Sequence, residues 1–127
     1  MSFAAGTIID TIDGNIPIEK LPKTGMVKTY DGTYVPFVYS GACGTEYTVI
    51  LTLSAGEHII CTPDQLFLAD DDWVEAKDSV DKYFYDEYNV EDSIQVKSIR
   101  VGGARLVYRL GVGTGDFCLA GNIIVTS

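Results

Sequence analysis

The chain has 127 residues, of which 46% are hydrophobic, and a formal net charge of −9. This length suits a single soluble domain with a real core, and no apolar run approaches the ~20 residues that span a bilayer, so we expect no membrane segment. The first residues lack the basic and apolar regions of a secretory signal. Three scattered cysteines (Cys43, Cys61 and Cys118) and one histidine favour free thiols in a reducing cytoplasm and give no credible zinc site.

Charge is distributed unevenly along the sequence. Residues 1–92 hold five Lys/Arg and 17 Asp/Glu, a net charge of −12, whereas residues 93–127 hold four Lys/Arg and one acid, a net charge of +3. A surface as acidic as the first part is a poor match for phosphate groups, so we expect no nucleic-acid partner. Either the opposite charges of the two parts attract each other, or the excess of acids is simply a solvated surface.

The first predicted element places a hydroxyl, Ser2, close to a strand. A turn-forming Ala5-Gly6 is followed by alternating Ile and Thr residues over 7–12, and Asp13-Gly14 is typical of a tight hairpin turn. A strand this close would hold Ser2 in place, whereas most termini fray. The alternative is a first strand that happens to begin with serine.

Further strands follow in short runs rich in β-branched and aromatic residues. Two prolines make 15–22 an edge segment and a turn. The small-residue segments 40–44 and 102–103 are predicted as turns. Strands are expected, in order, at 26–30, 33–39, 45–53, 58–62, 93–101, 105–112, 116–119 and 123–127. Between them, 65–68 is either extended or one helical turn, and 69–77 is an acidic turn with a short strand. Many short strands without a helical period predict a single all-β domain over 1–127, with both ends of the chain beside one sheet.

Residues 78–92 differ from the rest because they are acidic and aromatic, with no clean period. We expect a loop or an excursion from the main fold. Its aromatic residues are either a contact surface or, more simply, core packing. They are Tyr83, Phe84, Tyr85 and Tyr88.

Three blocks in order resemble a mini-intein, a member of the Hint superfamily of self-processing domains. The first matches the pattern in which a Cys or Ser precedes Phe-x-x-Gly-Thr. The second resembles the family's Thr-x-x-His block, and the third its closing Val-Tyr-Asp-Leu and Asn-Gly blocks. The blocks lie at 2–7, 56–68 and 106–127.

The resemblance implies a horseshoe-like all-β fold with both splice junctions in one central cleft. It implies single-turnover, autocatalytic protein splicing without a cofactor, with the flanking polypeptides as partners of a monomeric chain. Ser2 is then the first nucleophile, attacking the Met1 carbonyl to turn an amide into an ester, and Thr62 bonds that amide. A downstream residue next takes the acyl group, and a terminal Asn cyclises to release the product.

This sequence departs from the family at the proton-transfer positions. Gln65 stands where the family has a His, and Thr126 stands where the penultimate His is usual. Gly115 occupies the place of a third common His, which makes the adjacent Asp116 the candidate replacement base. A carboxamide does not titrate, so Gln65 can only hydrogen-bond or polarise. His58 matches none of these positions, and we expect no role for it.

Ser127 occupies the position of the terminal Asn, and serine has no side-chain amide nitrogen to form a succinimide. We therefore expect a form blocked at its C-terminal step, with the Asn replaced. The alternative is that Ser127 is the first residue of the downstream segment. None of the cysteines matches a catalytic position, so the resemblance implies serine-based chemistry, in an intein of the mini or split, phage-like type.

The charge asymmetry suggests a split intein that works in trans. An acidic N-piece and a basic C-piece, divided near 78–93, would associate by electrostatic steering, each being the other's complementary fragment. Two rival functions remain open. One is a Hint-type domain that cleaves without ligation, which needs no terminal Asn. The other is a small, non-catalytic β binding module.

Overall fold

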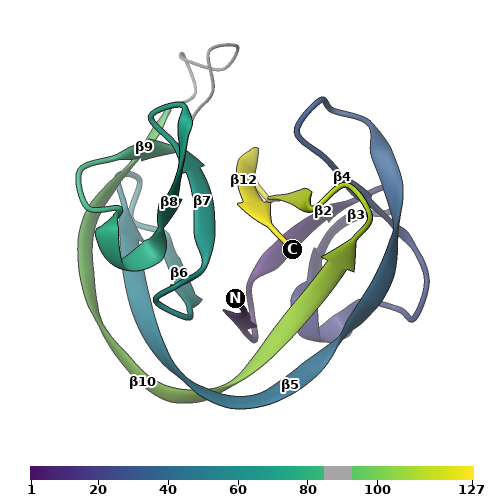
Figure 1. Ribbon diagram of the computed structural model, residues 1–127, viewed down its shortest axis with the longest axis horizontal. Helices are drawn as coiled ribbons and strands as arrows, with labels where there is room; N and C mark the ends of the chain where they lie inside the picture. The colour runs from purple at the N-terminus through teal and green to yellow at the C-terminus, as the bar shows by residue number, and fades with distance from the viewer. Residues whose placement is uncertain (85–92) are drawn as a thin grey trace.

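The computed structural model describes residues 1–84 and 93–127 and has the horseshoe shape that the resemblance implies. Two long, curved strands, β5 (Tyr34–Leu53) and β10 (Ile94–Val112), form the bend of the horseshoe, and shorter strands form its two arms (Figure 1). Both marked ends of the chain lie between the arms. The predicted all-β class is confirmed, and no helix in the described part of the chain is long and apolar enough to span a membrane.

Every strand pairing in the described ranges is antiparallel, and the strands follow the order β8-β7-β12-β11-β2-β4-β5-β6-β1-β10-β9, with β3 beside β2. Two short 3₁₀ turns lie at Ile18–Lys20 and Ala76–Asp78. The remaining strands are β1 (Phe3–Ala4), β2 (Ile8–Thr11), β3 (Gly14–Pro17), β4 (Met26–Lys28), β6 (His58–Cys61), β7 (Leu66–Ala69), β8 (Asp72–Glu75), β9 (Tyr83–Phe84), β11 (Asp116–Leu119) and β12 (Ile123–Thr126).

The predicted turns at 40–44 and 102–103 are wrong, because both segments lie inside the long strands. β5 and β10 pair from Val96↔Leu53 to Val112↔Phe37, and small residues occupy places where the register shifts. A Cβ on Gly102 would collide with the hydroxyl of Thr48. Gly102 therefore permits a close approach of β5 and β10 and does not end a strand.

One of these register shifts is a β-bulge at Cys43. Gly44 pairs with Val107 and Ala42 pairs with Tyr108, which leaves Cys43 between them without a partner in the ladder. Gly44 has a φ of 103°, a conformation that favours glycine. Bulges bend a strand and redirect a side chain, and they are common beside active sites.

A cluster of phenylalanines joins the arms and holds β1 in place. Phe3 packs edge-on against Phe67 and Phe117, with both pairs of ring centroids 6.2 Å apart. Phe84 stacks on Phe67 at 4.8 Å and is buried, so it serves as core packing. Tyr83 is 40% exposed. Tyr85 and Tyr88 lie outside the described residues.

Candidate functional site

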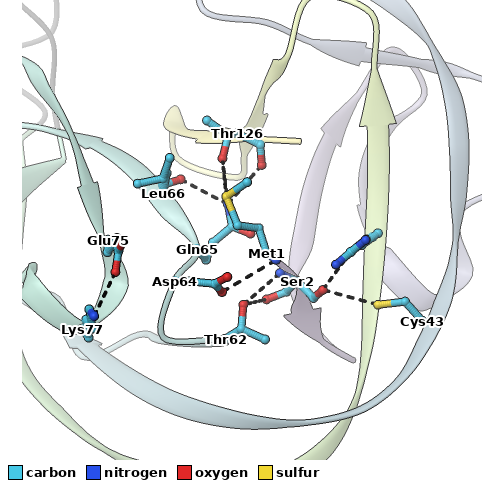
Figure 2. A network of polar contacts seen from close by, with 11 residues as sticks. Met1, Ser2, Cys43, Thr62, Asp64, Gln65, Leu66, Glu75, Lys77 and Thr126 are labelled. Carbon is cyan, nitrogen blue, oxygen red and sulfur yellow. Dashed lines mark hydrogen bonds and ion pairs between the residues drawn. The ribbon is translucent and has the colours of Figure 1, made fainter.

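Ser2 is fully buried at the centre of the horseshoe, immediately before β1. Phe3 pairs with Cys61 of β6 on one side and with Tyr108 of β10 on the other. The backbone amide of Thr62 donates to the Ser2 carbonyl at 3.0 Å. The Ser2 amide donates to Thr62 Oγ1 at 3.0 Å, and the Thr62 hydroxyl lies 3.5 Å from the Ser2 carbonyl oxygen (Figure 2). The amide that joins Met1 to Ser2 thus contacts the Thr62 hydroxyl, the residue that the resemblance names for this amide.

The Ser2 hydroxyl itself contacts two side chains from the long strands. Its Oγ lies 3.3 Å from Cys43 Sγ, and Arg109 Nε donates to it at 3.4 Å. The Cys43 thiol also lies 3.5 Å from the Val107 carbonyl oxygen, to which it donates. These contacts place a thiol and a guanidinium beside the candidate nucleophile.

Asp64 lies on the other side of Ser2 in the turn after β6 (Figure 2). The Thr62 hydroxyl beside it holds the pKa of the Asp64 carboxyl below its usual range, and the Met1 amino group contributes to the same shift. That amino group lies 3.7 Å from Asp64 Oδ1. Asp64 therefore orients Thr62 and the Met1 side of the amide.

Gln65 links the two ends of the chain. Its side chain is only 1% exposed, and its Nε2 donates to the carbonyl oxygens of Thr126, at 3.0 Å, and Leu66, at 3.2 Å. The Thr126 hydroxyl in turn lies 3.2 Å from Met1 Sδ. Gln65 and Thr126 consequently position β12 against the residue that precedes Ser2.

Ser127 follows β12 and lies near Met1 at one cavity. Its amide donates to the Gly115 carbonyl at 2.9 Å. Met1, Arg109 and Ser127 line one cavity of about 220 Å³, together with Tyr39, Leu110 and Gly111. Both ends of the chain therefore meet at one cleft, as expected.

Asp116 and His58 have different contacts from the residues around Ser2. The Asp116 carboxylate accepts a hydrogen bond from the Tyr30 amide at 2.8 Å, although its backbone pairs with Thr126. His58 lines a separate, largely apolar cavity of about 290 Å³ with residues such as Leu53 and Ile123. Within 1–84 and 93–127, no three His, Cys, Asp or Glu side chains are grouped as metal ligands would be.

Cys43 and Arg109 were not singled out from the sequence. The small-residue run around Cys43 had suggested a turn away from any site. Arg109 stands in the run 106–110, where the resembled block has Asp, and this reversal of charge is the one signal that could have pointed to it. The cysteine has no comparable signal, because the bulge that aims it depends on pairing with β10.

Known proteins resemble the chain through structure alone. No protein-family model and no curated protein matches it. A variant of the gp41-1 intein matches with a TM-score of 0.83 at 16% identity, covering 99% of this chain and 98% of that one. A DnaB intein from Synechocystis sp. PCC 6803 matches at 0.79 and 18% identity, covering 99% and 97%, and the MchDnaB-1 intein at 0.81 and 13%, covering 98% and 99%. At such identities the likeness establishes the fold, which is the Hint/intein fold.

Proposed function

We propose that this chain is a protein-splicing element that begins with an N-to-O acyl shift at Ser2. The observation that carries the proposal is the amide between Met1 and Ser2, held by Thr62 on an intein fold. The Thr126 hydroxyl lies against the Met1 side chain, and Ser127 lines one cavity with Met1. A fold alone does not specify chemistry. Here a hydroxyl stands beside the bond it would rearrange, and the opposite end of the chain is brought to the same cavity.

In the proposed first step, Ser2 Oγ attacks the carbonyl carbon of Met1, and the bond to the Ser2 nitrogen breaks to leave an ester. Thr62 holds that nitrogen through its hydroxyl at 3.0 Å, which fixes the amide for attack. The Thr62 hydroxyl donates to the Ser2 carbonyl oxygen at 3.5 Å, which adds a second contact between the same two residues. The first residue of a downstream segment then takes the acyl group from Ser2.

We further propose that the form with Ser127 stops before release. Gln65 positions the Thr126 carbonyl, but a carboxamide transfers no proton at neutral pH, and Ser127 has no side-chain amide nitrogen to cyclise. The same observation favours a second function, a Hint-type domain that transfers or loses its upstream segment without ligation. The binding-module alternative loses part of its support, since Phe84 is buried in the core.

The partners proposed for this chain are the two flanking polypeptides. A complementary fragment is a further proposal, because the strand β10 belongs to the part with net charge +3 and pairs along the length of β5, which belongs to the part with net charge −12. Opposite charges on two such pieces would accelerate their encounter. The location we propose for these reactions is the reducing cytoplasm.

The test is a fusion with one reporter before Met1 and another after residue 127, made with Ser127 and with Ser127→Asn. We expect hydroxylamine-sensitive cleavage at Ser2 in both forms and joined reporters in the Asn form alone. Ester cleavage in both forms without joining in either would support the autocleaving alternative. No cleavage and no joining would contradict both functions.

A further inference from the structure

We propose that Cys43 and Arg109 activate the Ser2 hydroxyl, with the thiolate of Cys43 as proton acceptor and the Arg109 guanidinium as the cation that stabilises the reacting oxygen. This inference rests on the proposed acyl shift at Ser2 and names the groups that drive it. Both side chains touch the reacting atom, Ser2 Oγ, at 3.3 Å and 3.4 Å. Hydroxyl groups need such an adjacent base, because they are weak nucleophiles when protonated.

Each hydrogen bond at the Ser2 hydroxyl has a defined donor and acceptor. A guanidinium can only donate, so Arg109 Nε–H uses a lone pair of Ser2 Oγ. The Cys43 thiol has one hydrogen, which it gives to the Val107 carbonyl. In the contact between Ser2 and Cys43, the hydroxyl is therefore the donor and the sulfur the acceptor. Once Cys43 has lost its hydrogen, the thiolate sulfur can only accept, so the Ser2 hydroxyl is the donor in that state as well and its proton points at the atom that would receive it.

The fold supplies this contact through the bulge in β5. Cys43 is the unpaired residue between the Gly44 and Ala42 rungs, and the opposing segment of β10 carries Arg109. The half-buried thiol reaches Ser2 from β5, whereas Thr62 lies in the turn after β6. Figure 2 shows Asp64 and Cys43 on opposite sides of Ser2. Thr62 thus contacts the amide nitrogen on one side of Ser2, and Cys43 contacts the hydroxyl on the other side.

The remaining charged groups near this cluster are engaged elsewhere. The Asp64 carboxylate lies 3.7 Å from the Met1 amino group. Gln65 does not titrate and is bonded to Thr126. Arg109 is the charged side chain that contacts Ser2 Oγ, and it would stabilise negative charge on that oxygen.

The proposed step is balanced in atoms and protons. The Ser2 Oγ proton moves to the Cys43 thiolate as Oγ bonds to the Met1 carbonyl carbon. The bond between that carbon and the Ser2 nitrogen then breaks, and the nitrogen takes the proton that Cys43 holds. The products are an ester on Ser2, a free Ser2 amine and the original thiolate. No oxidant, metal or further reactant is required.

The experiment measures hydroxylamine cleavage of the full chain with a reporter fused before Met1, at saturating hydroxylamine, as a function of pH. We expect the rate to rise with pH, because the step needs a deprotonated base beside Ser2. Cys43→Ser keeps a hydrogen-bonding group but should abolish that rise and slow cleavage about 100-fold, a typical contribution of a general base. Arg109→Ala should slow cleavage similarly, with partial recovery in Arg109→Lys.

Two variants control for non-specific effects. Arg105→Ala removes an exposed arginine of the same strand whose guanidinium bonds the Gly102 carbonyl, and it should leave the rate unchanged. Circular dichroism and urea midpoints identify any Cys43 variant that fails to fold, and alkylation of the folded wild type at Cys43 gives an independent block. A wild-type rate and pH profile in folded Cys43→Ser would overturn this proposal alone. Absence of cleavage in the wild type at every pH would overturn the acyl shift as well.

Discussion

The buried side chain of Gln65 donates a hydrogen bond to the main-chain carbonyl of Thr126 at 3.0 Å, across 61 residues of sequence. This one contact connects the turn that holds Thr62 to the strand β12 that leads to Ser127. Because Thr62 bonds the amide of Ser2, the carboxamide couples the two ends of the chain through two hydrogen bonds.

Gln65→Ala should destabilise the fold by about 1–3 kcal/mol, because the buried Thr126 carbonyl would lose its donor. Gln65→Glu should be less stable at neutral pH, since a carboxylate repels both carbonyl oxygens, and should recover in acid as it gains a proton to donate. Urea unfolding at pH 7 and pH 4 measures both effects. Gln95→Ala, which removes the contact of a less buried glutamine with the Asp81 carbonyl, is the control. Equal midpoints for the Gln65 and Gln95 variants would contradict the role of Gln65.

Thr62→Ala should slow ester formation at Ser2 about 100-fold, the loss typical of removing one hydrogen-bonding group from a reacting centre. Thr62→Ser keeps the oxygen that lies 3.0 Å from the Ser2 nitrogen and should retain most of the rate. Hydroxylamine cleavage followed by mass spectrometry gives both rates. If the alanine variant cleaves as fast as the serine variant, the hydroxyl has no part in the reaction.

Much of the fold follows from local patterns, and the site follows only in part. The hairpin of β2 and β3 was marked by Asp13-Gly14, and the pairing of Asp10 with Asn15 confirms it. The long strands were broken too early in the prediction, because glycine-rich runs mark bulges as readily as turns. The pairing with the partner strand distinguishes a bulge from a turn, and a single sequence does not reveal that pairing.

The cluster at Ser2 shows the same limit. Ser2 and Thr62 carried motif signals, and the structure places them in contact. Cys43 and Arg109 reach Ser2 across 41 and 107 residues, through the register of β5 against β10. That register depends on bulges that local propensity does not encode. The polar partners of Asp116 likewise could not be read from its neighbours in the chain.

The cysteines should differ sharply in reactivity. Burial raises the pKa of the Cys61 thiol well above its usual range, and Cys118 is also buried, whereas Cys43 is half-exposed. Since the thiolate is the reactive species, brief treatment of the folded protein with iodoacetamide at pH 8 should label Cys43 alone. Peptide mapping before and after unfolding measures this. Labelling of Cys61 at the rate of Cys43 in the folded protein would contradict the structure.

Asp64 should give the protein a small acid-sensitive contribution to stability. Its pKa is lowered in the folded state, chiefly by the Thr62 hydroxyl, so the unfolded chain binds a proton more readily. The contribution is present above the ordinary pKa of aspartate, about 3.9, and is lost as pH falls through the folded value. Because the side chain is 63% exposed, solvent screening keeps the effect modest. Asp64→Asn should reduce the loss of unfolding free energy between pH 5 and pH 3, and an unchanged acid profile would contradict this.

Residues 1–92 and 93–127, made separately, should associate faster at low ionic strength, because their net charges are −12 and +3. The association rate should fall as salt is raised. Stopped-flow fluorescence of Trp73 provides the signal. An association rate that does not change with salt, or no complex at all, would contradict the proposal of a steered split.

The central claim is that Ser2 attacks the carbonyl of the residue before it. The most direct measurement is the intact mass of a fusion, with a reporter before Met1, after incubation with hydroxylamine. The account predicts an upstream product that ends in a Met1 hydroxamate and a fragment that begins at Ser2, with neither formed by Ser2→Ala. An uncleaved wild-type fusion, or equal cleavage in the alanine variant, would contradict it.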